Sequence, residues 1–337
     1  MCIAALLAGC AVQSGPEGGA AHLPNAGVLP FTPAEGPEPF AAKGRSYTRP
    51  WALPLPGGGF RAWVAERETG SGGKERILAV DAPDAVTWSL DGARTALEPS
   101  QPWEAGSVRA PCVRFDAGSW ILWYVGGGAG IGIAVSQDGE SWTRGGAAPV
   151  FTPQGWETGG EPALDAPSVV SDGKVYRMYY LAGGGAGVGA AESADGVTWE
   201  RLRSTPILAP PGDPGDGTVP WDRDTLTGLS VSRVLTPAGR VQLRMWYGAG
   251  RRKQSGDLEG AIGFAASFDG LDFTRMEANP VLFLSGLGAA EPWVIPATEP
   301  PVMLYSRYWK KDGANRRVVT FATGTVEPVV LGGVDAE

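Results

Sequence analysis

Short runs of alternating or continuous hydrophobic residues, each ended by a polar or glycine-rich turn, fill most of this chain. Residues 169–182, VVSDGKVYRMYYLA, and 188–194, VGAAESA, are two of these runs. They are rich in β-branched and aromatic residues, and Asp-Gly or Gly-Gly pairs stand between them where the chain would reverse. The pattern predicts short antiparallel strands joined by hairpins rather than helices.

The runs recur as an internal repeat. Three copies align clearly: APCVRFDAGSWILWY (110–124), APSVVSDGKVYRMYY (166–180) and GLSVSRVLTPAGRVQLRMWY (228–247). Two weaker copies begin at Arg49 and Glu291, which makes five. Four short strands per repeat are typical of a propeller blade. The sequence therefore predicts an all-β, five-bladed β-propeller of four-stranded antiparallel blades over residues 46–332, with blades at 46–98, 103–150, 156–208, 221–283 and 287–332.

The element S-x-D-G ends three of the repeats, in segments 136–144, 193–201 and 267–275. Its Gly supplies the positive φ of a turn, and its Ser and Asp side chains are expected to cap backbone amides there. The aromatic residue that follows, Trp142, Trp199 or Phe273, is expected to wedge between neighbouring blades. Because the same Asp recurs in each copy, we interpret it as structural and not as part of a single active site.

Two glycine clusters, 126–132 and 183–189, resemble a loop that wraps a phosphate. Such a loop needs a helix behind it, whose N-terminus helps to bind the anion. A turn and a strand follow each cluster here. We therefore interpret the glycines as blade architecture that lets strands lie close together or opens a wide rim.

Composition excludes several classes of partner and site. The net charge is −8 and there is no run of Lys or Arg, so no nucleic-acid partner is expected. The only His, His22, precedes the repeats, and Cys112 is the only Cys within them. A Ser-His-Asp triad, a Cys-His pair and a His-based zinc site are therefore excluded from the repeats, and no metal or cofactor is predicted.

The first ten residues, MCIAALLAGC, resemble a bacterial lipobox, in which Cys10 would become the lipidated first residue, although no Lys or Arg precedes the apolar run. The alternative is a chance Cys after small residues. Residues 11–45 are rich in Gly and Pro and suit a tether. The prediction is a monomeric lipoprotein of the cell envelope, with residues 1–10 as its signal segment, Cys10 as its membrane anchor, and a location in the outer membrane, the periplasm or outside the cell.

Residues that break the repeat at the inner end of a blade are the candidates for chemistry. Counting back fourteen residues from the aromatic position of the second strand gives Arg49, Arg109, Asp165 and Glu291, and alignment adds Thr227. This register is expected to surround the propeller axis, where a funnel would hold a ligand.

Three features resemble the five-bladed propeller glycosidases, which include arabinanases, β-xylosidases, invertases and levansucrases. They are Asp165 ahead of APSVVSDGKVYRMYY, the segment WDRD (221–224) ahead of TGLSV, and the repeated S-x-D-G-x-x-W. The likeness covers residues 46–332. It implies a carbohydrate ligand and three acidic groups from successive blades: an Asp base or nucleophile, an Asp that tunes a pKa, and a Glu acid. The first two blades depart from that pattern, because they carry Arg49 and Arg109.

Three hypotheses follow. In the first, the chain is a glycoside hydrolase with a displaced catalytic triad, in which Asp165 is the base, Asp224 or Asp222 the modulator and Glu291 the acid. In the second, the triad is lost and the funnel binds an anionic or polyhydroxyl ligand. In the third, the propeller docks another envelope protein through its rim.

The candidates also have structural interpretations. Asp165 could cap its own turn, and Glu291 could be a solvated rim residue. Asp222 follows a Trp, as Glu104 and Glu157 do, so the W-[DE] pair could be architectural, whereas Asp224 has no such repeat partner. Under the binding hypothesis, the candidate substrate-binding residues, two of them aromatic rings that could stack on sugars, are Arg49, Arg109, Trp221, Asp222 and Trp293.

Overall fold

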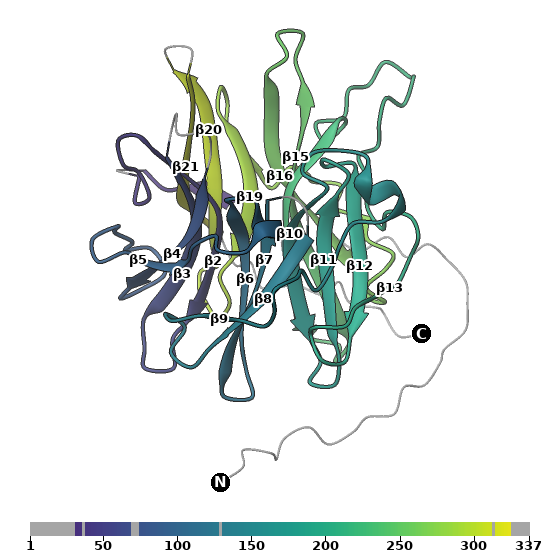
Figure 1. Cartoon of the computed structure of the whole chain (residues 1–337). Coiled ribbons are helices and arrows are strands. Elements are labelled where there is room, and N and C mark those ends of the chain that lie inside the picture. The colour runs from purple at the N-terminus through teal and green to yellow at the C-terminus, as the bar shows by residue number, and fades with distance from the viewer. Residues whose placement is uncertain (1–30, 36–37, 69–73, 128–129, 312–313, 325–337) are drawn as a thin grey trace.

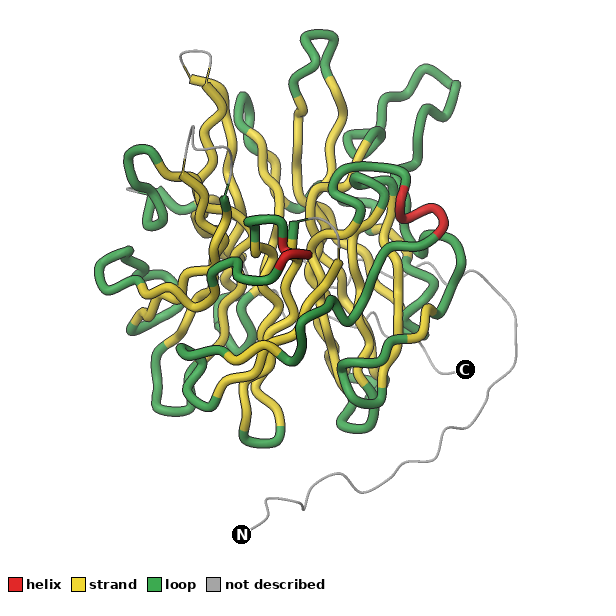
Figure 2. The backbone as a smooth tube through the Cα atoms, in the orientation of Figure 1, coloured by secondary structure: helices red, strands yellow, loops and turns green. Residues whose placement is uncertain are grey.

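The computed structural model describes residues 31–35, 38–68, 74–127, 130–311 and 314–324. Five antiparallel sheets stand side by side around one axis, as Figure 1 shows. Within the described residues the helical segments are two 3₁₀ turns, η1 (Pro102–Glu104) and η2 (Gly155–Thr158), and the rest is strand and loop (Figure 2). Neither of these turns, nor any other described part of the chain, is a helix long and apolar enough to cross a bilayer. The predicted five-bladed, all-β propeller is confirmed.

Each of the first four blades is built from strands that follow one another in the chain and pair in that order. The first blade contains β2 (Arg45–Pro54), β3 (Phe60–Glu68), β4 (Glu75–Ala82) and β5 (Arg94–Leu97). The second contains β6 (Val108–Asp116), β7 (Ser119–Gly126), β8 (Gly130–Ser136) and β9 (Thr143–Arg144). The third contains β10 (Leu164–Ser171), β11 (Tyr176–Ala182), β12 (Gly187–Ser193) and β13 (Glu200–Arg201). The fourth contains β14 (Thr225–Leu235), β15 (Val241–Arg252), β16 (Leu258–Ser267) and β17 (Thr274–Arg275), and β18 (Leu282–Phe283) also pairs with β16.

The fifth blade closes the ring with strands from both ends of the chain. Its inner strands are β19 (Gly288–Val294), β20 (Val302–Lys311) and β21 (Ala314–Gly324), and its outer strand is β1 (Phe31–Pro33), which pairs antiparallel with β21. Closure of this kind ties the N-terminal and C-terminal parts of the described chain into one blade, and the outer edge strand of that blade is short. Residues 31–33 lie in the stretch 11–45 for which the sequence suggests a tether, so part of that stretch belongs to the propeller. A three-residue strand is too short to show the alternation by which strands are recognised.

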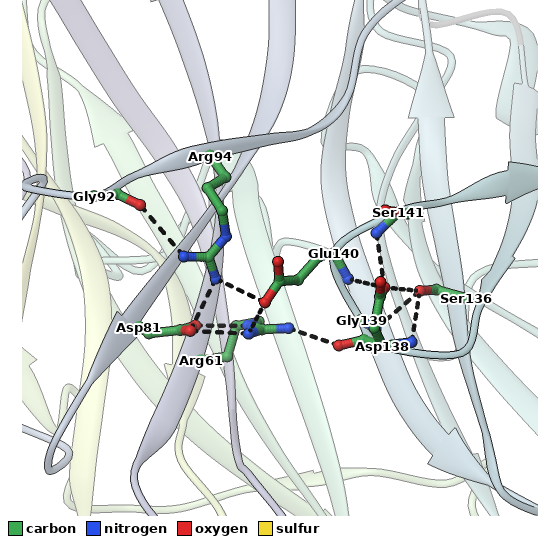
Figure 3. Close-up of polar contacts among 9 residues, drawn as sticks. All are labelled: Arg61, Asp81, Gly92, Arg94, Ser136, Asp138, Gly139, Glu140 and Ser141. Carbon is green, nitrogen blue, oxygen red and sulfur yellow. Dashed lines mark hydrogen bonds and ion pairs between the residues drawn. The ribbon is translucent and has the colours of Figure 1, made fainter.

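The S-x-D-G turns have the structural role expected of them. In the second blade the hydroxyl of Ser136 accepts a hydrogen bond from the N–H of Gly139 at 2.8 Å, and one carboxylate oxygen of Asp138 accepts from the two following N–H groups (Figure 3). These backbone bonds lower the pKa of Asp138 to about 2. Arg61 of the preceding blade donates to the Asp138 carbonyl at 2.8 Å. The same capping bonds recur in the third and fourth blades.

The aromatic residue after each of these turns wedges against the previous blade, as predicted. Trp142, Trp199 and Phe273 meet an aromatic ring of the preceding second strand edge to face, with interplanar angles of 78°, 77° and 85°. Edge-to-face packing is a preferred arrangement of aromatic pairs. The repeat therefore specifies both the turn and the contact between blades.

A second repeated feature ties the start of a blade to its outermost strand. Glu104 in η1 is fully buried, and its Oε1 accepts from the Tyr124 hydroxyl at 2.8 Å and from Arg144 Nε at 2.7 Å. The groups Glu157–Tyr180–Arg201 and Asp222–Tyr247–Arg275 repeat these contacts. We name these three groups the peripheral carboxylate clusters. The W-[DE] pair is thus architectural, and Asp222 belongs to it.

The glycine clusters make room for the tyrosine rings of these groups and for the neighbouring Trp103. A Cβ atom on Gly126 would lie 2.3 Å from the Trp103 ring, and one on Gly132 would lie 2.6 Å from the Tyr124 ring. Gly189 has the same relation to Tyr180, at 2.3 Å. The glycines are architectural, as expected, but the close approach they allow is between ring and strand.

Candidate functional site

The inner strand of each blade carries a bulge where it reaches the axis. In the first blade Arg49 and Pro50 together stand opposite one residue of β3. Arg49, Ala110, Ala166 and Glu291 each precede a Pro and have φ values between 45° and 55°, which residues other than glycine seldom adopt. In the fourth blade Gly228 takes this place, because a Cβ atom there would lie 2.5 Å from the Cα of Glu291.

The bulges revise the register expected from the sequence. Arg49 and Glu291 directly precede their prolines, whereas Arg109 and Asp165 lie one position earlier, where the inner strand is still paired with the second strand. In the first blade the count of fourteen residues fails because Trp51 pairs with Trp63 in a hairpin one residue longer than those of the second and third blades. In the fifth blade it fails because Leu304, and not the counted Tyr305, pairs with Trp293. The side chains expected in one circle around the axis therefore lie at two adjacent levels of the inner strands: Arg49 and Glu291 at one, and Arg109 and Asp165 at the other.

The bulges leave almost no space at the axis itself. A cavity of about 20 Å³, room for about one water, is lined by inner-strand residues of all five blades. A ligand as large as a sugar therefore has to bind above the bulges, at the end of the propeller where the inner strands begin.

Asp165 and Glu291 meet there on either side of the Arg49 guanidinium, and we name these three residues the axial cluster. Arg49 donates from Nε and Nη2 to the two Asp165 oxygens at 2.9 and 2.5 Å. Its Nη1 lies 3.4 Å from Glu291 Oε1, and its backbone N–H donates to Glu291 Oε2 at 3.0 Å. The hydroxyl of Ser306 also donates to Glu291. The structure thus brings together two of the three carboxylates proposed as catalytic.

A second guanidinium, that of Arg109, lies on the other side of Asp165. Its Nε is 3.7 Å from Asp165 Oδ1, and its Nη1 is 3.4 Å from an oxygen of Glu75. That same Glu75 oxygen accepts from the Ser107 hydroxyl at 2.8 Å. Both arginines expected at the axis are therefore present and ion-paired.

The pKa values of Asp165 and Arg49 in the axial cluster are both shifted in favour of the charged form. Burial would raise the pKa of Asp165, but the charges of Arg49 and Arg109, with the hydrogen bonds from Arg49 and from the N–H of Ala166, outweigh it and hold that pKa below its usual value. Burial would lower the pKa of Arg49, and its two carboxylate neighbours outweigh this and raise it. Asp165 is therefore an ionised hydrogen-bond acceptor and does not hold a proton for use as a general acid.

Asp224 does not join this cluster. It is exposed just before β14, where its two oxygens accept from Arg223 Nε at 2.7 Å and from the N–H of Arg252 at 2.6 Å. These bonds lower the pKa of Asp224. Asp224 pairs with its neighbour Arg223 at the rim and is not part of the axial cluster. The site expected to contain three carboxylates therefore contains two.

The tryptophans expected to stack on sugars are engaged in packing. Trp293 is 5% exposed, stacks on Trp51 with ring centroids 3.5 Å apart, and donates from its Nε1 to the Ala52 carbonyl at 2.7 Å. Trp221 stacks on Tyr247 of its own blade at 5.7 Å. Contacts between and within blades account for both rings.

A polar pocket of about 450 Å³ opens above the axial cluster, and we name it the funnel. Arg49 and Arg109 form its floor, and Arg67, Glu75, Glu161 and Arg317 are among the residues of its wall. The side chains of Ser46 and Thr48 add hydroxyl groups. The funnel is therefore rich in donors and acceptors and poor in apolar surface.

A second pocket of about 370 Å³, the aromatic pocket, lies between the fourth and fifth blades and shares Arg317 with the funnel. Tyr308 and Trp309 line it together with Lys253 and Glu259. Its walls include the hairpins β15–β16 and β20–β21, which rise at one end of the propeller in Figure 1. The sequence reasoning missed this pocket. Its signals were the insertion in the fourth repeat and the aromatic run YSRYW at 305–309.

Two predictions concern ligands and anchors. Within the described ranges, no group of three or more His, Cys, Asp or Glu side chains is placed to hold a metal ion. Cys10, the predicted lipidation site, and the signal segment lie outside the described residues, so they stay predictions.

Comparison with known proteins supports the fold. No family model and no curated protein sequence matches the chain. Among solved structures, a complex of BT0996 with RGII is similar at 17% identity, over 93% of this chain and 95% of that one, with a TM-score of 0.63. The α-L-arabinofuranosidase PaAbf62A from Podospora anserina, in complex with cellotriose, is similar at 12% identity, over 88% and 97%, with a TM-score of 0.60.

A third similar structure is an N-acetylgalactosamine deacetylase from F. plautii in complex with blood group B trisaccharide, at 16% identity over 88% and 94%, with a TM-score of 0.57. At these identities the likeness establishes a shared fold. The predicted resemblance to the five-bladed propeller glycosidases is confirmed at that level, and what the chain does has to be argued from its own site.

Proposed function

We propose that this chain is a carbohydrate-binding propeller of the glycosidase type, which holds an oligosaccharide in the funnel and does not cleave it by the two-carboxylate route. The observation that carries this proposal is the position of Arg49, whose guanidinium fills the space between Asp165 and Glu291. In a glycosidase the scissile bond lies between the two carboxyl groups. Here that space is occupied by a cation that both carboxylates bind.

The protonation of the cluster also argues against hydrolysis by this route. A glycosidase keeps one carboxyl protonated as the general acid while its partner is ionised. The pKa of Asp165 is lowered. Glu291 accepts from the Arg49 N–H and the Ser306 hydroxyl, so it acts as an acceptor as well. Asp165 is therefore not prepared to donate a proton to a leaving oxygen, and the oxygens of Glu291 already face the donors of Arg49 and Ser306.

Binding is supported by the surroundings of the cluster. The funnel offers charged and hydroxyl groups, and the aromatic pocket beside it offers the rings of Tyr308 and Trp309. Fixed polar groups hydrogen-bond to the hydroxyl groups of a sugar, and aromatic rings pack against the apolar face of the sugar ring. The similar structures in complex with RGII, cellotriose and a blood group trisaccharide make a saccharide the ligand class to test first.

The test combines binding with turnover. Calorimetric titration with a panel of neutral and acidic oligosaccharides is expected to find a ligand, while aryl arabinosides and xylosides are hydrolysed no faster than in buffer. Trp309→Ala is expected to weaken binding about tenfold, and Phe115→Ala, which removes an exposed ring on β6, is the matched control. Turnover that Asp165→Asn or Glu291→Gln abolishes would overturn the proposal in favour of a hydrolase.

The hydrolase remains the second candidate because of one observation. Two buried carboxylates from different blades contact the same guanidinium, so they are as close as a hydrolytic pair requires. The third hypothesis, docking of another envelope protein through the rim, has no comparable observation in its favour. Substrate, lipid anchoring and cell-envelope location are part of the proposal and are tested separately, the last two by acyl labelling of Cys10 and its Cys10→Ser variant in cells.

A further inference from the structure

Three arginines from three blades converge on the wall and floor of the funnel. Arg67 is the penultimate residue of β3 in the first blade, Arg109 is the second residue of β6 in the second, and Arg317 lies on β21 in the fifth. The blade architecture does not require these arginines, because other blades have different residues at the corresponding positions. Arginine clusters of this kind are the protein's means of binding a carboxylate by paired hydrogen bonds.

These arginines have donors to spare. The Arg67 guanidinium is exposed and makes no ion pair or hydrogen bond with any described residue. The Nε of Arg109 is buried and has no hydrogen-bond partner among the described residues, since its nearest carboxylate oxygen is 3.7 Å away. Arg317 is half exposed, and its Nη1 is 3.8 Å from Glu291. A buried donor without an acceptor is costly, and a bound acceptor would remove that cost.

The charge balance of the funnel differs from that of the whole chain. Arg49 pairs with Asp165 and Glu291 at short distances, whereas Arg109 and Arg317 reach these same two carboxylates only at 3.7 and 3.8 Å. Glu75 and Glu161 are the other carboxylates of the funnel. The four arginines are thus balanced by four carboxylates, Asp165 and Glu291 included, in a chain whose net charge is −8. A negatively charged ligand would find here the donors that the protein itself does not satisfy.

We propose that the funnel selects an anionic saccharide, a hexuronate-containing oligosaccharide whose carboxylate is bound by Arg67, Arg109 and Arg317. The inference rests on the proposed function, and it adds the class of sugar. Ser46 and Thr48 supply hydroxyl groups for the rest of the ring, and Arg317 lies where the saccharide chain passes from the funnel to the aromatic pocket.

The experiment compares each acid with its uncharged counterpart. The full chain is titrated calorimetrically with trimers of galacturonate and of glucuronate, with their methyl esters, and with the matching neutral galactose and glucose trimers. One acid is expected to bind at least about tenfold more tightly than its ester. This preference is expected to shrink between about 50 mM and 500 mM salt, because charge–charge attraction is screened.

Variants assign the selectivity to residues. Arg67→Gln is expected to reduce the preference for the acid about tenfold without affecting the fold, because Arg67 is exposed and pairs with no residue that the structure describes. Arg109→Gln is expected to do the same, and its folding is checked by thermal unfolding. Arg233→Gln, an exposed arginine near the far end of β14, is the matched control.

The outcomes separate this inference from the proposed function. Equal binding of acid and ester, or an unchanged preference in both arginine variants, overturns the anionic selectivity and leaves saccharide binding standing. Failure of every acidic and neutral sugar to bind overturns the proposed function itself.

Discussion

The axial cluster and the peripheral carboxylate clusters both contain buried carboxylates paired with arginine. They differ in how often they occur in the propeller and in whether they adjoin a pocket. Glu104, Glu157 and Asp222 each bind a Tyr and an Arg, lie between 0% and 4% exposed, and recur in three blades. Asp165 and Glu291 are equally buried, at 6% and 5%, yet they share one arginine that occurs once and lines the funnel.

The difference teaches how to separate architecture from function in a repeat protein. A buried ion pair is weak evidence of either, because both kinds of cluster contain one. Recurrence with the same partners indicates that the pair holds a blade together. A pair that breaks the repeat, on a strained bulge and beside a solvent-accessible pocket, is the better candidate for a site.

The largest effect is expected at a peripheral cluster. Glu104→Ala leaves Arg144 and Tyr124 buried without their shared acceptor, so it is expected to lower the free energy of unfolding by about 3–5 kcal/mol. Urea unfolding followed by fluorescence of the tryptophans measures this. Glu98→Ala, an exposed carboxylate paired with Arg76, is the control and should change stability by less than about 0.5 kcal/mol. Saccharide binding by the folded fraction should be unchanged.

The axial cluster is expected to respond differently to loss of its arginine. Arg49→Met leaves Asp165 and Glu291 buried side by side, at a cost of about 3 kcal/mol at neutral pH. Arg109 stays 3.7 Å from Asp165, but burial and the adjacent Glu291 carboxylate are expected to outweigh it once Arg49 is lost and to raise the pKa of Asp165 above its unfolded value. The folded variant then binds more protons, so its deficit shrinks as the pH falls from 7 to 5. Unfolding at both pH values measures this. A deficit that does not change with pH would contradict the proposed role of the guanidinium.

The Glu104→Ala deficit provides the comparison for that pH dependence. Removal of the Glu104 side chain leaves a cation and no unpaired carboxylate. In the wild type the pKa of Glu104 is lowered, because its hydrogen bonds outweigh the effect of burial. Nothing in that cluster titrates between pH 7 and 5. Its deficit is therefore expected to stay constant over this range.

The fold could be predicted from the sequence because its determinants are local and repeated. The S-x-D-G turn and the following aromatic residue appear three times, so each copy confirms the others. The closing strand β1 could not be predicted, because it has three residues and gains its stability from pairing with β21, far along the chain. The pairing of β1 with β21 depends on how the propeller closes and not on the local sequence pattern.

The site was predicted only in part for a related reason. Counting residues located Asp165 and Glu291, but it could not reveal that bulges set them in two adjacent positions or that Arg49 lies between them. Asp224 looked significant because it lacks a repeat partner, whereas it pairs with its neighbour Arg223. One side of the aromatic pocket, including Lys253 and Glu259, is formed by an insertion, for which the repeat offers no template.

A smaller effect is expected where the aromatic pocket depends on a glycine. A Cβ atom on Gly288 would lie 2.0 Å from the Tyr308 ring, so Gly288→Ala is expected to displace that ring and cost about 2 kcal/mol. Saccharide affinity should fall in the same variant, as calorimetry can measure. Gly146→Ala, where a Cβ atom would meet nothing within 4 Å, is the matched control. Undiminished affinity in Gly288→Ala would remove the aromatic pocket from the binding surface.

The smallest stability change is expected from Asp165→Asn, which keeps the shape of the side chain and removes its charge. Arg49 retains Glu291, so the loss at neutral pH should be about 1 kcal/mol. Because the pKa of Asp165 is lowered in the folded protein, its contribution is complete above the unfolded value of about 4 and is lost as the pH falls through the lower folded value. The variant lacks this contribution, so the stability curves of wild type and variant should converge in acid. Thermal unfolding from neutral pH down to about pH 3 measures the convergence, and parallel curves would show that Asp165 is not the ionised acceptor that the axial cluster requires.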